Sequence, residues 1–162
     1  SFDLQTKSIE NNNIKNVKLF NKIVYEESGK IIKIKTSQTG TGTSSICRHL
    51  KHYDTFFNVE TIKLDDVEFK EGIGLIKIDV ESAEWGVLLG ASQLIKRDKP
   101  VIILETFKTI RNIEKLTRFA VDYNYKIDYL SADNYLLIPE YVSVHNLVEP
   151  GISIPHSLGL QG

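Results

Sequence analysis

Cysteine and methionine are nearly absent from this 162-residue chain, which contains one cysteine, Cys47, and no methionine. A single cysteine excludes an internal disulfide and any zinc site built from several thiolates. Without methionine, Ser1 is not an unprocessed translation start, and we expect the chain to be cut from a longer protein. The sequence also lacks an apolar run long enough to span a membrane and a signal-peptide pattern at its amino terminus. These absences predict an intracellular, cytoplasmic protein.

An excess of charge of one sign is lacking as well. Lysine and arginine total 20 residues and aspartate and glutamate total 21, which leaves a formal net charge of -1. This balance gives no electrostatic signal for nucleic acid or an anionic membrane, and we predict neither as a partner. Hydrophobic residues at 41% and charged residues at 25% are ordinary for a globular protein. The length suits one domain with a buried core.

Two alternating hydrophobic periods divide the chain into strands and helices. The predicted strands are the end of a strand at 1–4, then 17–25, 32–34, 59–64, 73–80, 101–104, 126–130 and 134–138. The predicted helices run to about residue 13 and over 47–53, 82–97 and 109–123, and a loop rich in Gly, Thr and Ser covers 37–45. Ser82 is the expected N-cap of its helix. The last two strands are joined by three residues, too few for a crossover helix, so they must form an antiparallel hairpin.

The order of these elements predicts an α/β fold. Strand–helix–strand alternation with continuous apolar strands is typical of a mostly parallel sheet that helices cover on both faces. The terminal hairpin adds an antiparallel end to that sheet. We assign residues 1–140 to this α/β domain and residues 141–162, which contain Pro150, Gly151 and Pro155, to an extended tail.

Acidic side chains follow three of the predicted strands. Asp3, Asp79 and Glu105 each stand where an apolar strand ends. In parallel sheets ligands bind at the carboxyl ends of the strands, and strand direction and connection handedness place all three acids on that one rim. Lys77 is two residues before Asp79, so it lies on the same strand face. We expect this lysine to neutralise a neighbouring acid rather than to take part in catalysis.

Three motifs carry a family resemblance. Residues 75–84 (LIKIDVESAE), 88–91 (LLGA) and 99–105 (KPVIILE) together resemble the FkbM family of methyltransferases, and weaker similarity extends over roughly residues 1–139. The resemblance implies a Rossmann-like domain that uses S-adenosylmethionine for O-methylation of a small-molecule or sugar hydroxyl. The chain departs from the family pattern at Ser82, where glycine is usual. It also lacks the first strand, glycine-rich cofactor loop and first helix, which in the family lie before the position of Ser1.

The resemblance also implies roles for individual side chains. Asp3 and Gln5 correspond to the strand end that binds the cofactor ribose, although a surface acid near a chain end explains Asp3 as well. Methyl transfer to a hydroxyl is an in-line displacement that needs alignment and a base for the hydroxyl proton. Asp79 is the candidate base and cofactor contact, and Glu81 is the second catalytic candidate, unless Glu81 only satisfies the helix start. Glu105 is placed to bind acceptor hydroxyls.

The loop beside these strands supplies the remaining candidates. The resemblance implies that this loop closes over the acceptor, with Ser44 and His52 as the predicted acceptor contacts. His49 and His52 could supply a base or bind a metal, but an isolated pair of this kind is usually just two surface residues. Asp79 and Glu105 are carboxylates of the kind that hard divalent cations prefer, but two acids are too few ligands to predict a metal site.

Two other classes of function remain open from sequence. A non-catalytic binding or assembly module could keep the methyltransferase fold without cofactor binding, and the missing glycine-rich loop supports this alternative. A nicotinamide-dependent oxidoreductase also accommodates Asp3, but the terminal hairpin argues against it.

The partners we expect are a small-molecule or glycan acceptor, and a homo-oligomer is left open. Trp85 is expected in the core.

Overall fold

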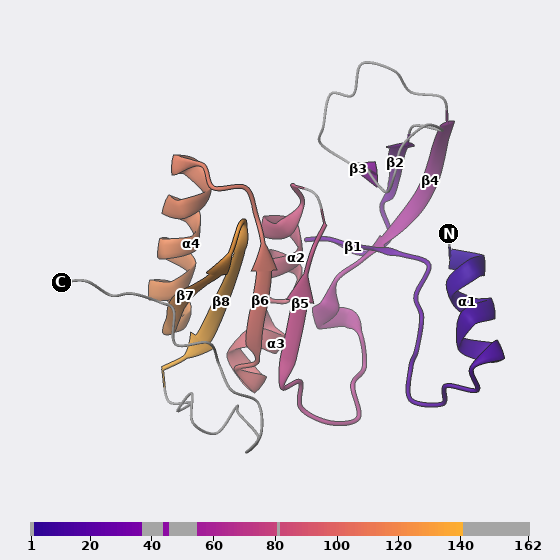
Figure 1. The fold of residues 1–162 in the computed structure, drawn as a ribbon, viewed down its shortest axis with the longest axis horizontal. Helices are drawn as coiled ribbons and strands as arrows, with labels where there is room; N and C mark the ends of the chain where they lie inside the picture. Colours follow the sequence, from indigo (N-terminus) through magenta and orange to yellow (C-terminus); the bar gives the residue numbers. More distant parts are fainter. Residues whose placement is uncertain (1, 37–43, 46–54, 81, 141–162) are drawn as a thin grey trace.

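The computed structural model describes residues 2–36, 44–45, 55–80 and 82–140 and has an α/β architecture (Figure 1). The helices are α1 (Phe2–Asn11), α2 (Glu84–Gly90), α3 (Ser92–Asp98) and α4 (Ile110–Tyr123), with a short 3-10 turn η1 (Leu64–Asp66). The strands are β1 (Ile23–Val24), β2 (Ile31–Thr36), β3 (Ser44–Ser45), β4 (Thr55–Ile62), β5 (Leu75–Ile78), β6 (Val101–Glu105), β7 (Tyr125–Ser131) and β8 (Asn134–Pro139). Within the described residues they form two four-stranded sheets, ordered β1-β4-β2-β3 and β5-β6-β8-β7.

The second sheet is mixed rather than mostly parallel. β5 and β6 pair in parallel, whereas β8 is antiparallel to both β6 and β7. The predicted hairpin is confirmed, and its second strand enters the middle of the sheet. In the first sheet, β4 is parallel to β1 but antiparallel to β2. The prediction of a mostly parallel sheet is therefore correct only for the neighbouring pair β5 and β6 and for the two-residue strand β1.

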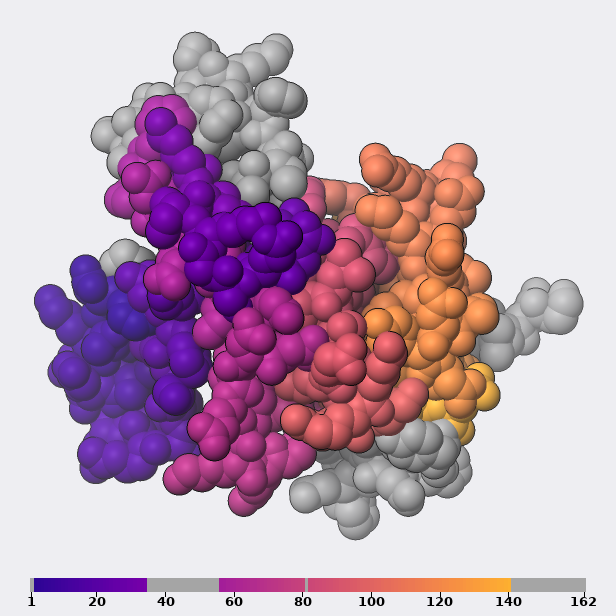
Figure 2. Space-filling view, turned by 180° about the vertical axis from the view of Figure 1, so that it is seen from behind, coloured from indigo at the N-terminus to yellow at the C-terminus, as the bar shows by residue number. Residues whose placement is uncertain are grey.

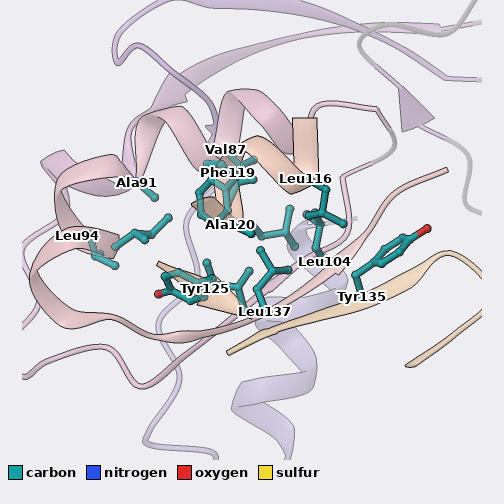
Figure 3. Packing of buried hydrophobic residues seen from close by; sticks show 14 residues of the cluster. Val87, Ala91, Leu94, Leu104, Leu116, Phe119, Ala120, Tyr125, Tyr135 and Leu137 are labelled. Carbon is teal, nitrogen blue, oxygen red and sulfur yellow. The ribbon is translucent and has the colours of Figure 1, made fainter. Parts of the chain in front are cut away.

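The core lies between one face of the second sheet and the helices α2, α3 and α4 (Figure 3). Ile102, Leu104 and Leu137 are fully buried on this face. The helical side chains that the sequence placed on one apolar face are also buried: Val87, Leu88, Ala91, Leu94 and Ile95. On the opposite face, the paired row Lys77, Ile103 and Leu136 is at least partly exposed. The expectation that helices cover both faces is wrong for the described residues.

The predicted helix over 82–97 is two helices that meet at Ala91. Asp65, in η1, causes the break because its carboxylate lies at the start of α3. The backbone N–H groups of Gln93 and Leu94 donate to this carboxylate at 3.1 and 2.9 Å. These are amides that the first turn of a helix leaves without a partner, and a carboxylate satisfies them as an N-cap would. A residue 27 or more positions away in sequence therefore ends one helix and begins the next.

Replacing Asp65 tests this remote cap. We expect Asp65→Ala to lower the free energy of unfolding by about 1–2 kcal/mol, the usual cost of losing an N-cap. Asp65→Asn keeps an oxygen that can accept the same bonds and should lose less than half as much. Urea denaturation followed by far-UV circular dichroism measures both values. Equal losses in the two variants would show that the carboxylate charge, and not the capping geometry, matters.

A second acid, Asp98, joins the end of α3 to the loop before β5. Its carboxylate accepts from Arg97 Nε at 2.6 Å and from the backbone N–H of Ile73 at 2.9 Å. The Arg97 hydrogen bond, followed by the Ile73 bond, lowers the pKa of Asp98 to about 2. Because the folded-state pKa lies below that of an unfolded aspartate, the carboxylate stabilises the fold above about pH 4. That stabilisation is lost as the pH falls toward 2.

The Asp98→Asn variant isolates this pH dependence. The asparagine oxygen can still accept from Ile73, but the ion pair with Arg97 is removed. We expect wild type to be the more stable protein at pH 7 and the difference between the two proteins to shrink from about pH 5 to pH 2. Urea unfolding of both proteins across this range measures the difference, which cancels the titration of all other groups. A stability difference between the two proteins that stays constant with pH would contradict the lowered pKa of Asp98.

The amino-terminal part departs most from the sequence prediction. Residues 2–11 form α1, which has no buried residue; the helix predicted to about residue 13 is confirmed, but it replaces the strand end predicted at residues 1–4. Only Ile23 and Val24 of the predicted strand 17–25 pair, and β4 begins four residues before its predicted start. Figure 1 shows β2 and β4 as an arm directed away from the core, and Figure 2 shows the amino-terminal segment and α4 on opposite sides of the molecule. The predicted helix 47–53 lies outside the described residues.

Candidate functional site

The candidate site lies at the carboxyl ends of β5 and β6. Asp79 directly follows β5 and Glu105 is the last residue of β6. Lys77 Nζ lies 3.2 Å from Asp79 Oδ2 and 3.9 Å from Glu105 Oε2, so one ammonium group bridges the two carboxylates. Each of the three side chains is about half exposed, at 49%, 53% and 45%. The parallel pairing of β5 with β6 thus brings together two of the three predicted rim acids, and the predicted neutralising role of Lys77 agrees with this geometry.

Beside this ion pair lies a small hollow of ≈ 60 Å³. Four carboxylate residues contribute to its wall, together with Thr106 and Phe107: Asp79, Glu84, Glu105 and Asp133. Glu84 is the first residue of α2 and only 3% exposed, and Asp133 stands in the turn between β7 and β8. Four acids around one cavity, with a single lysine paired to two of them, favour groups that are positively charged or donate hydrogen bonds.

The wall beyond β6 is held by its own hydrogen bonds. The backbone N–H of Thr106 donates to the Asp133 carbonyl at 2.8 Å. Asn112, in the first turn of α4, donates through Nδ2 to Thr106 Oγ1 at 3.1 Å and to the Phe107 carbonyl at 2.9 Å. Thr109, the N-cap of α4, accepts from the Asn112 backbone N–H at 3.2 Å. This loop is therefore fixed at both ends, which suits a site that must hold a ligand in one orientation.

Tyr135 is a buried polar residue next to this wall. It is 5% exposed, and its hydroxyl, which points away from the core cluster in Figure 3, has no hydrogen-bond partner among the described residues. Burial, followed by the negative charge of Asp133, raises the pKa of Tyr135 above its ordinary value. The phenol therefore stays neutral at physiological pH.

The outer edge of β5 is open in the part of the chain that the structure describes, because no strand pairs with it there. An apolar hollow of ≈ 300 Å³ lies along this edge and reaches Lys77 and Val80 on either side of Asp79. Leu75 remains 58% exposed at this edge. The size of the hollow is within the range of pockets that bind small molecules.

Two predicted site residues that the structure describes, Asp3 and Gln5, are not brought to this rim. Asp3 and Gln5 are exposed on α1, which Figure 1 places at the far end of the molecule from α4 and well apart from the ends of β5 and β6. The prediction that Asp3 ends a strand and shares the rim is wrong. Glu81 and His52 lie outside the described residues, as does His49, and for Ser44 only the backbone, in β3, is described. Their predicted roles stay predictions.

The comparisons with known proteins address the family directly. A family model described as the methyltransferase FkbM domain matches residues 5–133. The chain belongs to the FkbM methyltransferase family. Among solved structures, the crystal structure of methyltransferase FkbM from Methylobacillus flagellatus KT is similar, with a TM-score of 0.56 and 15% sequence identity. The match covers 83% of this chain and 32% of that one, so the chain spans about a third of that protein's length. No curated protein matched the chain.

Four lining residues of the candidate site were missed by sequence reasoning: Glu84, Thr106, Phe107 and Asp133. Glu84 was considered only as part of the motif at residues 75–84 and Asp133 only as part of the hairpin connection, whereas Thr106 and Phe107 were not considered. The signal for Asp133 was present, because a strand antiparallel to β6 must begin where β6 ends: Asn134 pairs with Glu105. Trp85 packs partly buried against the core cluster, as expected. Lys115 Nζ lies 5.3 Å from the centre of the Trp85 ring.

The described part of the chain contains neither a metal-binding group nor a membrane-spanning helix. No group of three or more His, Cys, Asp or Glu side chains in this part of the chain has a geometry that could hold a metal ion. In the same residues, no helix combines the length and the apolar composition that crossing a membrane requires.

Proposed function

We propose that the protein is an S-adenosylmethionine-dependent O-methyltransferase that acts on a hydroxyl of a small molecule or sugar, with the rim at β5 and β6 as its acceptor site. The observation that supports this most is the pair Asp79 and Glu105, bridged by Lys77 at the mouth of the acidic hollow. Membership of the FkbM family supports methyl transfer itself. Because the chain spans about a third of the related structure, the activity of the whole protein is part of the proposal.

The chemistry of the rim suits this cofactor in one respect. S-adenosylmethionine, when bound, supplies a methyl group on a positively charged sulfur. Asp79, Glu105 and Asp133 would stabilise that positive charge and hold it near the acceptor. The apolar hollow along β5 would take an uncharged part of the cofactor. The predicted ribose contacts of Asp3 and Gln5 gain no support from the position of α1.

The protein's own part in the reaction is to align the acceptor and remove its proton. Asp79 would accept the hydroxyl proton as the acceptor oxygen bonds to the methyl carbon and the carbon–sulfur bond breaks. Glu105 would accept a hydrogen bond from a second hydroxyl of the acceptor, and Asp133 lines the same wall. The hollow has room for one or two hydroxyl groups, so the rest of the acceptor would lie outside it. Neighbouring hydroxyls are a property of sugars, which supports a sugar acceptor.

Radiolabelled methyl transfer by the full-length protein tests the proposal. The acceptors should include monosaccharides and simple polyols, with amines and carboxylic acids as competing classes. We expect label in the hydroxyl compounds and unlabelled cofactor to compete. Titration calorimetry with S-adenosylmethionine provides the second measurement. Binding without transfer to any hydroxyl would overturn the O-methylation, and absence of binding would favour the non-catalytic module instead.

A further inference from the structure

The turn between β5 and α2 contains a residue in a strained conformation. Ser82 has a φ of 79°, in the left-handed region that a side chain with a β-carbon rarely adopts. This conformation is unfavourable for a non-glycine residue, because its β-carbon comes too close to the following carbonyl oxygen. Such residues persist when surrounding contacts hold them, and they concentrate at functional sites. The sequence predicted Ser82 as the N-cap of α2, and this prediction is wrong. Ala83 takes that position, without a side-chain hydrogen bond.

The contact that holds Ser82 comes from Glu84. Its Oε1 accepts a hydrogen bond from the Ser82 backbone N–H at 2.7 Å. A hydrogen bond to a carboxylate is short and roughly twice as strong as one between neutral groups. Glu84 is 3% exposed, and a side chain so buried has few other positions available to it. The bond therefore ties a strained backbone residue to the packed start of α2.

The same Glu84 side chain connects this turn with the acidic hollow. Glu84 lines the hollow together with Asp79, which lies three residues before Ser82. Glu84 thus holds the backbone of Ser82, three residues after Asp79, and lines the same hollow. We expect a change in the backbone at Ser82 to move the Asp79 carboxylate relative to Lys77 and Glu105. Displacements of this kind are costly in catalysis, since misplacing a reacting group by about 1 Å can reduce the rate about 100-fold.

We propose that Glu84 is a positioning residue for methyl transfer: by holding Ser82 in the left-handed conformation, it sets the direction in which Asp79 faces the acceptor. This inference rests on the proposed function, because it gives Asp79 its role as proton acceptor. It assigns no proton transfer to Glu84. It also accounts for the non-glycine residue at this turn, since glycine would adopt the same φ without a partner.

A rescue experiment separates positioning from direct chemistry. We expect Glu84→Ala to lower kcat about 10–100-fold with a smaller change in KM. Glu84→Gln keeps an oxygen that can accept from the Ser82 N–H and should retain most of the activity. Adding Ser82→Gly to Glu84→Ala should recover most of the lost kcat, because glycine needs no hydrogen bond to hold φ near 79°. Glu114→Ala, on the exposed side of α4, is the matched control for losing a glutamate.

A structural measurement keeps this test independent of the proposed function. In ¹⁵N-labelled protein, the amide resonances of Ser82 and Asp79 should shift in Glu84→Ala, and that of Asp79 should return toward its original position in the double variant. Full activity of Glu84→Ala, or unshifted Asp79 resonances, would overturn the proposal. So would a double variant and a Glu84→Gln variant that both stay inactive, because Glu84 would then act directly. If wild type itself transfers no methyl group, the proposed function fails, and the resonances alone decide the positioning.

Discussion

Asp79→Ala should reduce methyl transfer by the full-length protein about 100- to 10,000-fold, the range expected when a general base is removed. Asp79 is the carboxylate at the end of β5, beside Glu105 and within 3.2 Å of Lys77 Nζ. In the variant, Lys77 keeps only its longer contact with Glu105, and no carboxylate remains at the mouth of the hollow on β5. Because the Asp79 side chain is 53% exposed, the fold should survive the substitution. Initial rates with labelled S-adenosylmethionine measure the effect.

Two further variants test whether the loss of activity comes from removing a proton acceptor at position 79. Asp79→Asn keeps the shape of the side chain but not its capacity to take a proton, so we expect nearly the same loss of kcat. Asp128→Ala removes another strand carboxylate that pairs with a lysine, Lys126, at 2.9 Å, but on β7 and outside the hollow. This control should keep the wild-type rate. An Asp79→Asn enzyme with a wild-type rate would remove Asp79 from the proton transfer and leave it at most a binding role.

The parts of the fold that sequence predicted correctly depend on local rules. The hairpin follows from a connection too short for a crossover helix, and the ends of β5 and β6 follow from apolar runs that stop at Asp79 and Glu105. α4 begins at Ile110, after the cap Thr109, and ends at Tyr123, before Asn124 in the left-handed conformation, within a residue of its predicted bounds. In each case a short stretch of chain contains the information that determines the structure.

The errors of the sequence-based prediction arose where residues far apart in the sequence determine the local structure. Asp65 splits the predicted helix 82–97 by accepting hydrogen bonds from the backbone N–H groups of Gln93 and Leu94. No local sequence pattern predicts these hydrogen bonds. The strand end predicted at residues 1–4 rested on a pattern only four residues long, and the segment is helical instead. Glu84 was missed as a site residue because its role depends on a positive φ at Ser82, which sequence rules assign to glycine.

The packing of β1 against α2 gives the largest effect that we expect on stability. Gly86 and Gly90 are four residues apart, so they lie on the same face of α2. Tyr25, which follows β1, packs directly on both. A β-carbon at position 86 would lie 2.2 Å from the Tyr25 ring, and one at position 90 would lie 2.0 Å from the Tyr25 carbonyl oxygen. The two glycines thus form the contact through which the first sheet approaches the helices of the second.

Gly90→Ala should therefore destabilise the protein by about 1–3 kcal/mol, the usual cost of inserting a methyl group into a filled space. The clash is with backbone, so no rotamer change can relieve it, and α2 or the segment at Tyr25 must shift. Gly86→Ala should cost less, because the Tyr25 ring is a side chain that can turn. Gly74→Ala is the matched control: its β-carbon would meet no atom within 4 Å, so its stability should equal or slightly exceed that of wild type. Urea unfolding of the three variants measures the order of their stabilities directly. If Gly90→Ala were as stable as Gly74→Ala, β1 could not pack against α2 as closely as the structure places it, and the two sheets would have to be joined differently.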